Sequence, residues 1–194
     1  MALTFDTLTD DGVGEALDDL ARLRCEVFRD WPYLYDGDPA EEAAYLQSYR
    51  DTPGAILVAA RDGGTIVGCA TGMPLAGHED ARNVPLDALG LEVAQVFYCA
   101  ESVLLPAYRG QGAGHAFFDL REAHARARGF DVSMFCGVER PRDHPDRPAD
   151  ARPLAPFWEA RGYRARDALI HMTWTDRGAD APSRKALRVW TRPL

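Results

Sequence analysis

The segment from residue 104 to residue 114 has residue types and a spacing suited to holding a phosphate group. It joins an apolar, strand-like stretch (residues 93–105) to an amphipathic, helix-like stretch (residues 112–128). Glycine lets a backbone approach a ligand closely and turn where a Cβ would clash. The first N–H groups of a helix have no intrahelical partner and carry the positive end of its dipole. The segment has glycine at alternate positions, namely Gly110, Gly112 and Gly114. This order predicts a seat for a phosphate or pyrophosphate.

The residues of this loop also limit which class of phosphate ligand it can bind. The loop lacks the Gly-Lys-Ser/Thr ending of a Walker-type loop that holds Mg²⁺ and a γ-phosphate. Its glycine spacing also differs from the Gly-x-Gly-x-x-Gly of dinucleotide-binding folds. Read from Arg109, it is Arg-x-x-Gly-x-Gly, with Pro106 and Tyr108 ahead of it. In this it resembles the acetyl-CoA pyrophosphate loop of the GNAT superfamily of N-acetyltransferases. The alternative is a glycine turn that only packs a helix on a strand, and the flanking pattern and Arg109 favour the loop.

A second segment supports the same resemblance. Residues 155–163, Ala-Pro-Phe-Trp-Glu-Ala-Arg-Gly-Tyr, are similar to the Phe-Tyr-x-x-x-Gly-Phe segment of GNAT enzymes. On its own this match would be weak evidence, but it lies at the expected distance after the glycine loop. The resemblance covers the whole chain in the order of its elements, and at the level of motifs about a third of it.

The resemblance implies a set of residues that bind acetyl-CoA. Backbone N–H groups of the loop would hold the pyrophosphate, and Arg109 would close the loop from outside. The strand before it would pair with the pantetheine arm as an added strand. One N–H of that strand would polarise the thioester carbonyl and stabilise the oxyanion. The expected cofactor-binding residues are Val103, Leu104, Leu105, Arg109, Gly110, Gln111, Gly112, Ala113, Gly114, Phe157 and Trp158.

The acceptor amine needs a group that takes its proton. An alkyl amine with a pKa near 10.4 is mostly protonated at pH 7, and freeing its lone pair costs about 4.6 kcal/mol. A base within reach, directly or through one water, is therefore expected. Glu101 is the first candidate, because many GNAT members carry an acidic residue at this strand position. The alternative is a solvated or salt-bridged glutamate. Glu92 and Glu139, each at a strand end, are weaker candidates.

The leaving thiolate needs a proton in turn. GNAT enzymes often supply it from a tyrosine at the position that Trp158 occupies here. An indole N–H is a donor only and cannot act as a proton shuttle. Tyr163 corresponds to a core phenylalanine of the family, so packing is its expected role. Cys136 and Tyr98 are remoter candidates. A thiol pKa near 8.5 also lets the thiolate take a proton from the amine or from solvent.

The composition of the chain excludes some partners. The 194 residues carry a net charge of −8, which argues against nucleic acid or an anionic membrane as the main partner and is compatible with a cationic substrate.

The N-terminal residues have no basic start or apolar run, so we expect a cytoplasmic protein. The four cysteines are widely separated and are expected to be free and mostly buried. No metal site is expected, since the histidines lack ligand spacing. A homodimer is compatible with the sequence.

Periodicity predicts the elements that must position these groups. Strands are expected at residues 3–8, 55–61, 65–73, 93–105, 130–138, 168–175 and 186–192, and helices at residues 13–28, 39–50, 112–128 and 154–161. An aromatic loop at residues 31–39 has three readings: a lid over the acceptor, core filling or a dimer contact. The resemblance implies one α/β (α+β) domain over residues 1–194, with a mixed, mostly antiparallel central sheet flanked by helices on both faces.

These observations together predict an acyltransferase that moves an acetyl group from acetyl-CoA to a primary amine. Transfer would be direct, in a ternary complex, and the amine would belong to a small molecule or a protein. Two alternatives stay open. One is a non-catalytic acyl-CoA-binding module, suggested by Trp158, and the other is a different nucleotide-phosphate-binding domain that uses the same glycine loop.

Overall fold

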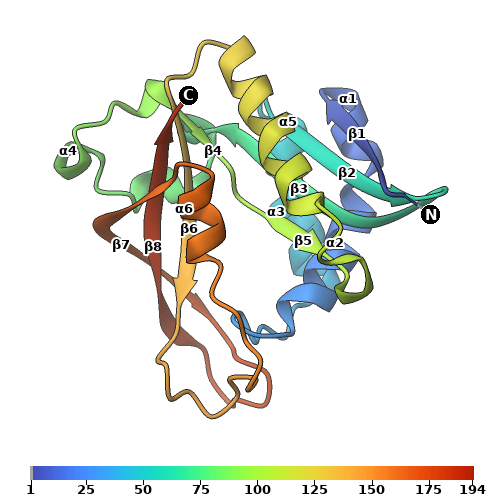
Figure 1. Ribbon diagram of the computed structural model, residues 1–194, viewed down its shortest axis with the longest axis vertical. Coiled ribbons are helices and arrows are strands. Elements are labelled where there is room, and N and C mark those ends of the chain that lie inside the picture. Colours follow the sequence, from blue (N-terminus) through green and yellow to red (C-terminus); the bar gives the residue numbers. More distant parts are fainter. Residues whose placement is uncertain (1) are drawn as a thin grey trace.

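The two strands that follow the first helices are apolar on both of their faces, as expected for strands covered from two sides. In β2 (Ile56–Asp62), Ile56 and Val58 belong to one hydrophobic cluster, while Leu57 and Ala59 belong to another. Successive side chains of a strand point to opposite faces. The computed structural model, which describes residues 2–194, accordingly shows a sheet with helices packed on both faces (Figure 1).

The central sheet has eight strands in the order β1-β2-β3-β4-β6-β8-β7, and β5 pairs with β3 off this path. All neighbouring strands are antiparallel except β4 and β6. The strands other than β2 are β1 (Thr4–Thr9), β3 (Thr65–Pro74), β4 (Val96–Tyr98), β5 (Ser102–Leu104), β6 (Val132–Glu139), β7 (Arg164–Trp174) and β8 (Ser183–Pro193). The mixed, mostly antiparallel sheet that was predicted is confirmed.

The helices form two layers. On one face, α2 (Leu17–Phe28) and α3 (Pro39–Asp51) pack on β2 and β3. On the other face, α5 (Ala113–Ala127) and the short α6 (Ala155–Ala160) cover the sheet in the foreground of Figure 1. The two remaining α-helices are α1 (Asp11–Glu15) and α4 (Leu86–Leu89). The glycine loop thus leads into the N-terminus of a long helix, as predicted.

The predicted helix at residues 13–28 is two helices, α1 and α2, which meet at Ala16. The backbone of Ala16 has ψ near 0°, and α1 contains two glycines, which weaken a helix interior. Residues 74–91, for which no helix was predicted, contain α4 and two 3-10 turns. The last two strands begin several residues earlier than the pattern predicted.

The predicted strand at residues 93–105 is also two strands, and this break matters most for function. β4 pairs in parallel with β6 through Val96, Phe97 and Tyr98. β5 pairs instead with β3, where Val103 lies opposite Cys69. Within residues 2–194 no helix is long and apolar enough to span a membrane.

Candidate active site

The break between β4 and β5 is held by two side chains from neighbouring elements. Thr71 of β3 exchanges backbone hydrogen bonds with Ala100 and Glu101, and its hydroxyl accepts the Glu101 N–H at 3.1 Å. Arg121, buried on α5, donates to the carbonyls of Thr71 at 2.9 Å and Glu101 at 3.0 Å. Buried backbone groups need such partners. The chain can therefore leave β6 after Cys99 and continue against β3 without orphaned polar groups.

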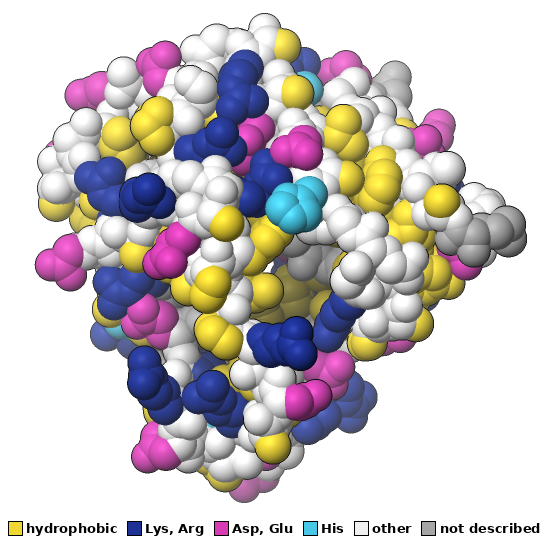
Figure 2. Space-filling model, viewed as in Figure 1, with side chains coloured by type: hydrophobic (Ala, Val, Ile, Leu, Met, Phe, Trp, Pro, Cys, Tyr) yellow, Lys and Arg dark blue, Asp and Glu magenta, His cyan; other side chains and the backbone are white. Residues whose placement is uncertain are grey.

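The consequence is an opening in the sheet between β5 and β6. Among the described residues, no backbone pairing joins these two strands. Figure 2, drawn from the same side as Figure 1, shows the surface hollowed between α6 and β6 on one side and α5 and β5 on the other, with hydrophobic side chains along its wall. We call this opening the splay. An unpaired strand edge beside an apolar wall suits an extended ligand with amide groups.

The glycine loop lies at the end of the splay, where α5 begins. Gly112 caps the helix with φ at 85°, and Gly110 has φ at 77°, a region that favours glycine. A Cβ added at either position would meet no atom within 4 Å, so the loop is open on this side. A Cβ at Gly114 would lie 3.3 Å from Phe157 of α6. The loop therefore leaves the first N–H groups of a 15-residue helix exposed to an anion.

The three strand residues predicted to pair with pantetheine do not all face the splay. The N–H of Leu105 donates to the carbonyl of Val67 in β3 at 3.0 Å. Because backbone groups alternate along a strand, Val103 also faces β3 and Leu104 faces the splay. A contact of Arg109 supports this orientation of Leu104, because the Arg109 Nε donates to the Leu104 carbonyl at 3.3 Å. Of the three, only Leu104 presents its backbone groups to the opening.

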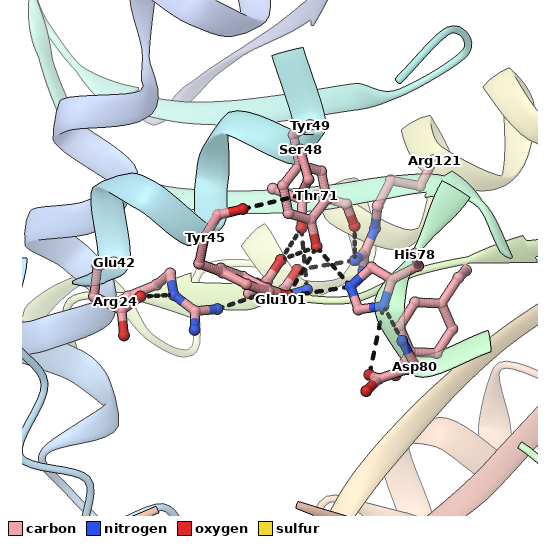
Figure 3. Close-up of polar contacts among 11 residues, drawn as sticks. Arg24, Glu42, Tyr45, Ser48, Tyr49, Thr71, His78, Asp80, Glu101 and Arg121 are labelled. Carbon is pink, nitrogen blue, oxygen red and sulfur yellow. Dashed lines mark hydrogen bonds and ion pairs between the residues drawn. The ribbon is translucent and has the colours of Figure 1, made fainter. Parts of the chain in front are cut away.

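Glu101 lies at the junction of β4 and β5, and its side chain points to the face of the sheet that α2 and α3 cover. It is 5 % exposed and accepts four hydrogen bonds (Figure 3). One oxygen accepts from Arg24 at 2.5 Å and from Tyr45 at 2.8 Å. The other accepts from Tyr49 at 2.7 Å and from the Thr71 hydroxyl. A carboxylate has about four lone-pair sites, so these donors saturate Glu101.

These partners decide the charge state of the cluster. Burial alone would raise the pKa of Glu101, but Arg24, the Thr71 hydroxyl, His78 and Tyr49 outweigh it and hold this pKa below its ordinary 4.5. Burial and the charge of Glu101 raise the pKa of Tyr45 well above 10. Glu101 is therefore ionised at neutral pH and Tyr45 keeps its proton. Arg24 is shared with Glu42, a second buried carboxylate.

A cavity of about 270 Å³ opens beside this cluster. Tyr49 is not part of its lining, to which polar groups are contributed by Arg24, Glu41, Glu42, Tyr45, His78, Glu79, Asp80, Glu101 and Thr173. Much of the remaining wall is aromatic or apolar: Phe28, Tyr33, Tyr35, Tyr98, Met172, Trp174 and Leu187. A cavity that combines an aromatic and apolar wall with convergent polar groups can bind a small molecule.

The aromatic loop before α3 closes one side of this cavity. Arg140 donates to the carbonyls of Pro32 at 2.8 Å and Tyr33 at 2.6 Å, and it forms a two-pronged ion pair with Asp176. The indole of Trp174 also donates to the Tyr33 carbonyl, at 3.0 Å. The loop is thus fastened to the β7–β8 hairpin and supplies part of the cavity wall. Tyr33 and Tyr35 also pack against the hydrophobic core, so the lid and core-filling alternatives both stay open.

Two aromatic residues that were singled out in the sequence, Trp158 and Tyr163, pack against other aromatic side chains or in the core. Trp158 packs edge-on against Phe135 and Trp190, and a Cβ at Gly137 would come within 2.9 Å of its indole. Tyr163 is fully buried and its hydroxyl contacts Ser133 and Glu122, so it is a core residue as expected.

The other acid and base candidates have different surroundings. Cys136 and Tyr98 line the cavity, but burial raises the pKa of Cys136 to about 12 and that of Tyr98 well above 10. Glu92 accepts a backbone hydrogen bond at the start of a 3-10 turn, and Glu139 is paired with Arg188. Neither of these glutamates lines the cavity. All four cysteines are free, and three are buried, as predicted. Among the described residues no group of three or more acidic, histidine or cysteine side chains could hold a metal ion.

The residues that hold Glu101 were not identified from the sequence. Two of them carried a detectable signal. Arg24 follows the buried Leu20 and Leu23 on α2, and Arg121 lies four residues from both Phe117 and Ala125 on α5. A charged residue on the apolar face of a helix implies a buried partner. The hydroxyl donors gave no such signal, because tyrosine and threonine are ordinary in half-buried positions.

Comparison with known proteins agrees with this geometry. Residues 18–148 match the family model described as "Acetyltransferase (GNAT) family". A GCN5-related N-acetyltransferase from Kribbella flavida is 21% identical, with a TM-score of 0.61 over 100% of this chain and 98% of that one. The PaiA N-acetyltransferase of Thermoplasma acidophilum, solved with coenzyme A, is 12% identical, with a TM-score of 0.57 over 100% of both chains.

An aminoglycoside 6'-N-acetyltransferase in complex with coenzyme A is 17% identical and has a TM-score of 0.62, over 100% of this chain and 97% of that one. At these identities the likeness shows the fold alone. No curated protein matches the chain.

Proposed function

Because the chain belongs to the GNAT acetyltransferase family, we propose that it transfers the acetyl group of acetyl-CoA directly to a primary amine bound in the aromatic cavity. The observation that carries this proposal is that a single break, between β4 and β5, forms both halves of the site. On one side it opens the splay beside the glycine loop, and on the other it sets Glu101 against the cavity. A thioester in the splay and an amine in the cavity would meet at this junction.

The acetyl-CoA half of the site rests on backbone groups. The N–H groups of Gln111, Gly112, Ala113 and Gly114 would hold the pyrophosphate at the positive end of α5. The Leu104 N–H would pair with the pantetheine arm or donate to the thioester oxygen as negative charge develops there. Arg109 would close the loop over the diphosphate. Phe157 and Trp158 of α6 would form the wall opposite β5.

The amine would lose its proton through Tyr45. Glu101 has no lone pair left for a direct contact, but Tyr45 lines the cavity and donates to Glu101 at 2.8 Å. As the amine nitrogen attacks the thioester carbon, its proton would pass to the Tyr45 oxygen while the Tyr45 proton passes to Glu101. The C–S bond then breaks and leaves a CoA thiolate. With a thiol pKa near 8.5, that thiolate can be protonated by solvent or by the proton released from the amine.

Turnover with a panel of amines tests this proposal. The protein is incubated with acetyl-CoA and each amine, and free CoA thiol and acetylated amine are both quantified. We expect equal amounts of the two products and intersecting double-reciprocal plots, as a ternary complex requires. A covalent acetyl-enzyme with parallel plots would contradict direct transfer.

The same experiment addresses the alternatives. Tight binding of acetyl-CoA without any acetylated amine would favour a non-catalytic module. Binding of ATP or NAD in preference to acetyl-CoA, measured by calorimetry, would favour another nucleotide-phosphate-binding domain. Either result would overturn the proposed function.

A further inference from the structure

A further buried carboxylate of the cavity, Asp80, has surroundings that differ from those of Glu101 and Glu42, which share Arg24. Asp80 is 4 % exposed and lines the cavity. Its Oδ2 accepts one neutral hydrogen bond, from the Tyr98 hydroxyl at 2.9 Å. Among the described residues, no hydrogen-bond donor reaches its Oδ1. Glu101, at similar burial, has four donors that include an arginine.

His78 makes its hydrogen bonds to groups other than the Asp80 carboxylate. Its Nδ1 lies 3.6 Å from the Asp80 carboxylate, but the same nitrogen accepts the backbone N–H of Asp80 at 3.1 Å. The Nε2 of His78 instead contacts the hydroxyls of Tyr45 at 3.1 Å and Tyr49 at 3.3 Å. The imidazole therefore belongs to the Glu101 cluster and separates it from Asp80.

The carboxylates of Glu101 and Asp80 point in different directions. In Figure 3, Glu101 points into the cluster of donors, whereas the Asp80 carboxylate, which lines the cavity, points away from it. A buried charge is normally paired with an opposite charge or a metal ion. The other buried cation at the cavity, Arg24, is already shared between Glu42 and Glu101. Among the described residues, no lysine or arginine pairs with Asp80, which lines the cavity.

We propose that Asp80 binds a second cationic nitrogen of the acceptor, so that the preferred substrate is a small diamine. This inference rests on the proposed function and deepens it. One amine would lie at Tyr45 and Glu101, where it reacts, and the other at Asp80, with His78 between the two anionic positions. The aromatic and aliphatic wall formed by Tyr33, Trp174 and Leu187 suits the carbon chain that joins them. The fastened loop and the modest volume of the cavity favour a small molecule.

The test compares diamines with mono-amines of equal length. Putrescine is matched with pentylamine, and cadaverine with hexylamine, in acetyl-transfer kinetics at saturating acetyl-CoA. We expect kcat/KM for each diamine to exceed that of its partner by about ten- to hundredfold, the range expected for a hydrogen bond to a charged group. Asp80→Asn keeps the shape of the side chain, and we expect it to remove most of this preference by raising KM. Asp87→Asn, which removes an exposed charge outside the cavity lining, is the matched control and should retain the preference.

The failure of this inference is distinct from the failure of the proposed function. Equal kcat/KM for diamines and mono-amines would overturn the role of Asp80 and leave the acetyltransferase assignment intact. Calorimetry with putrescine in the presence of CoA gives an answer even without turnover. Binding to the natural protein that Asp80→Asn weakens tenfold or more would support the site. Equal binding to both proteins, or none to either, would refute it.

Discussion

Glu101 combines two tasks in one side chain. Its four donors come from α2, α3 and β3, so the ionised carboxylate ties three elements together. Its pKa is held below 4.5, mainly by Arg24 and the hydroxyls against the effect of burial. A group with a depressed folded-state pKa stabilises the protein above its unfolded-state value, and this contribution is lost as the pH falls through the folded-state value.

Replacing Glu101 should therefore affect both rate and stability. We expect Glu101→Gln to lower kcat by roughly a hundredfold or more, with little change in the KM of acetyl-CoA. The loss should shrink at high pH, where more of the amine is already neutral. Removing one partner of a buried ion pair should also cost about 3–5 kcal/mol of unfolding free energy. In acid, the stability of the variant should vary less with pH than that of the natural protein. Kinetics and chemical unfolding measure the two effects.

A pair of tyrosines separates the two tasks. Tyr45 and Tyr49 both donate to Glu101, but only Tyr45 lines the cavity. We expect Tyr45→Phe to lower kcat and Tyr49→Phe to change mainly stability. Equal losses of kcat in both variants would show that Glu101 acts on the structure alone. Near-normal turnover of Glu101→Gln at pH 7 would remove Glu101 from the mechanism.

The glycine loop illustrates, at the scale of elements, what the sequence could reveal. Its spacing and the amphipathic stretch after it predicted a helix N-terminus with exposed N–H groups, because both features are local in sequence. The break between β4 and β5 was not predicted. It depends on Thr71 and Arg121, which lie about 20 to 30 residues away in sequence and meet Glu101 only in the folded chain. For the same reason Glu101 was predicted as a candidate, but not its four donors.

Two glycines of equal backbone strain test the loop. Gly112 and Gly129 flank opposite ends of α5, with φ at 85° and 80°, and an added Cβ would meet nothing within 4 Å at either one. Gly112→Glu places a side chain and a negative charge in the proposed pyrophosphate seat. We expect it to abolish acetyl-CoA binding in calorimetry, whereas Gly129→Glu should bind normally. Circular dichroism checks the folding of both. Normal affinity in a folded Gly112→Glu variant would contradict the loop assignment.

At the scale of the whole molecule, the sheet consists of two halves that part at the site. One half contains β1, β2, β3 and β5, and the other contains β4, β6, β8 and β7. They are joined in the sheet through two paired positions between β3 and β4, Met73 with Tyr98 and Pro74 with Phe97. An extended ligand in the splay would bridge the halves. The glycine loop, the strand junction and the cavity then form one continuous path from pyrophosphate to amine.

The position of the CoA sulfur in a crystal structure of the complex tests this path most directly. We predict that the diphosphate lies on the N–H groups of residues 111–114 and that the pantetheine arm runs along Leu104 between β5 and β6. The sulfur should then lie at the junction beside Glu101, facing the cavity lined by Tyr45 and Asp80. A CoA molecule bound elsewhere, or one whose sulfur points away from this cavity, would contradict the account.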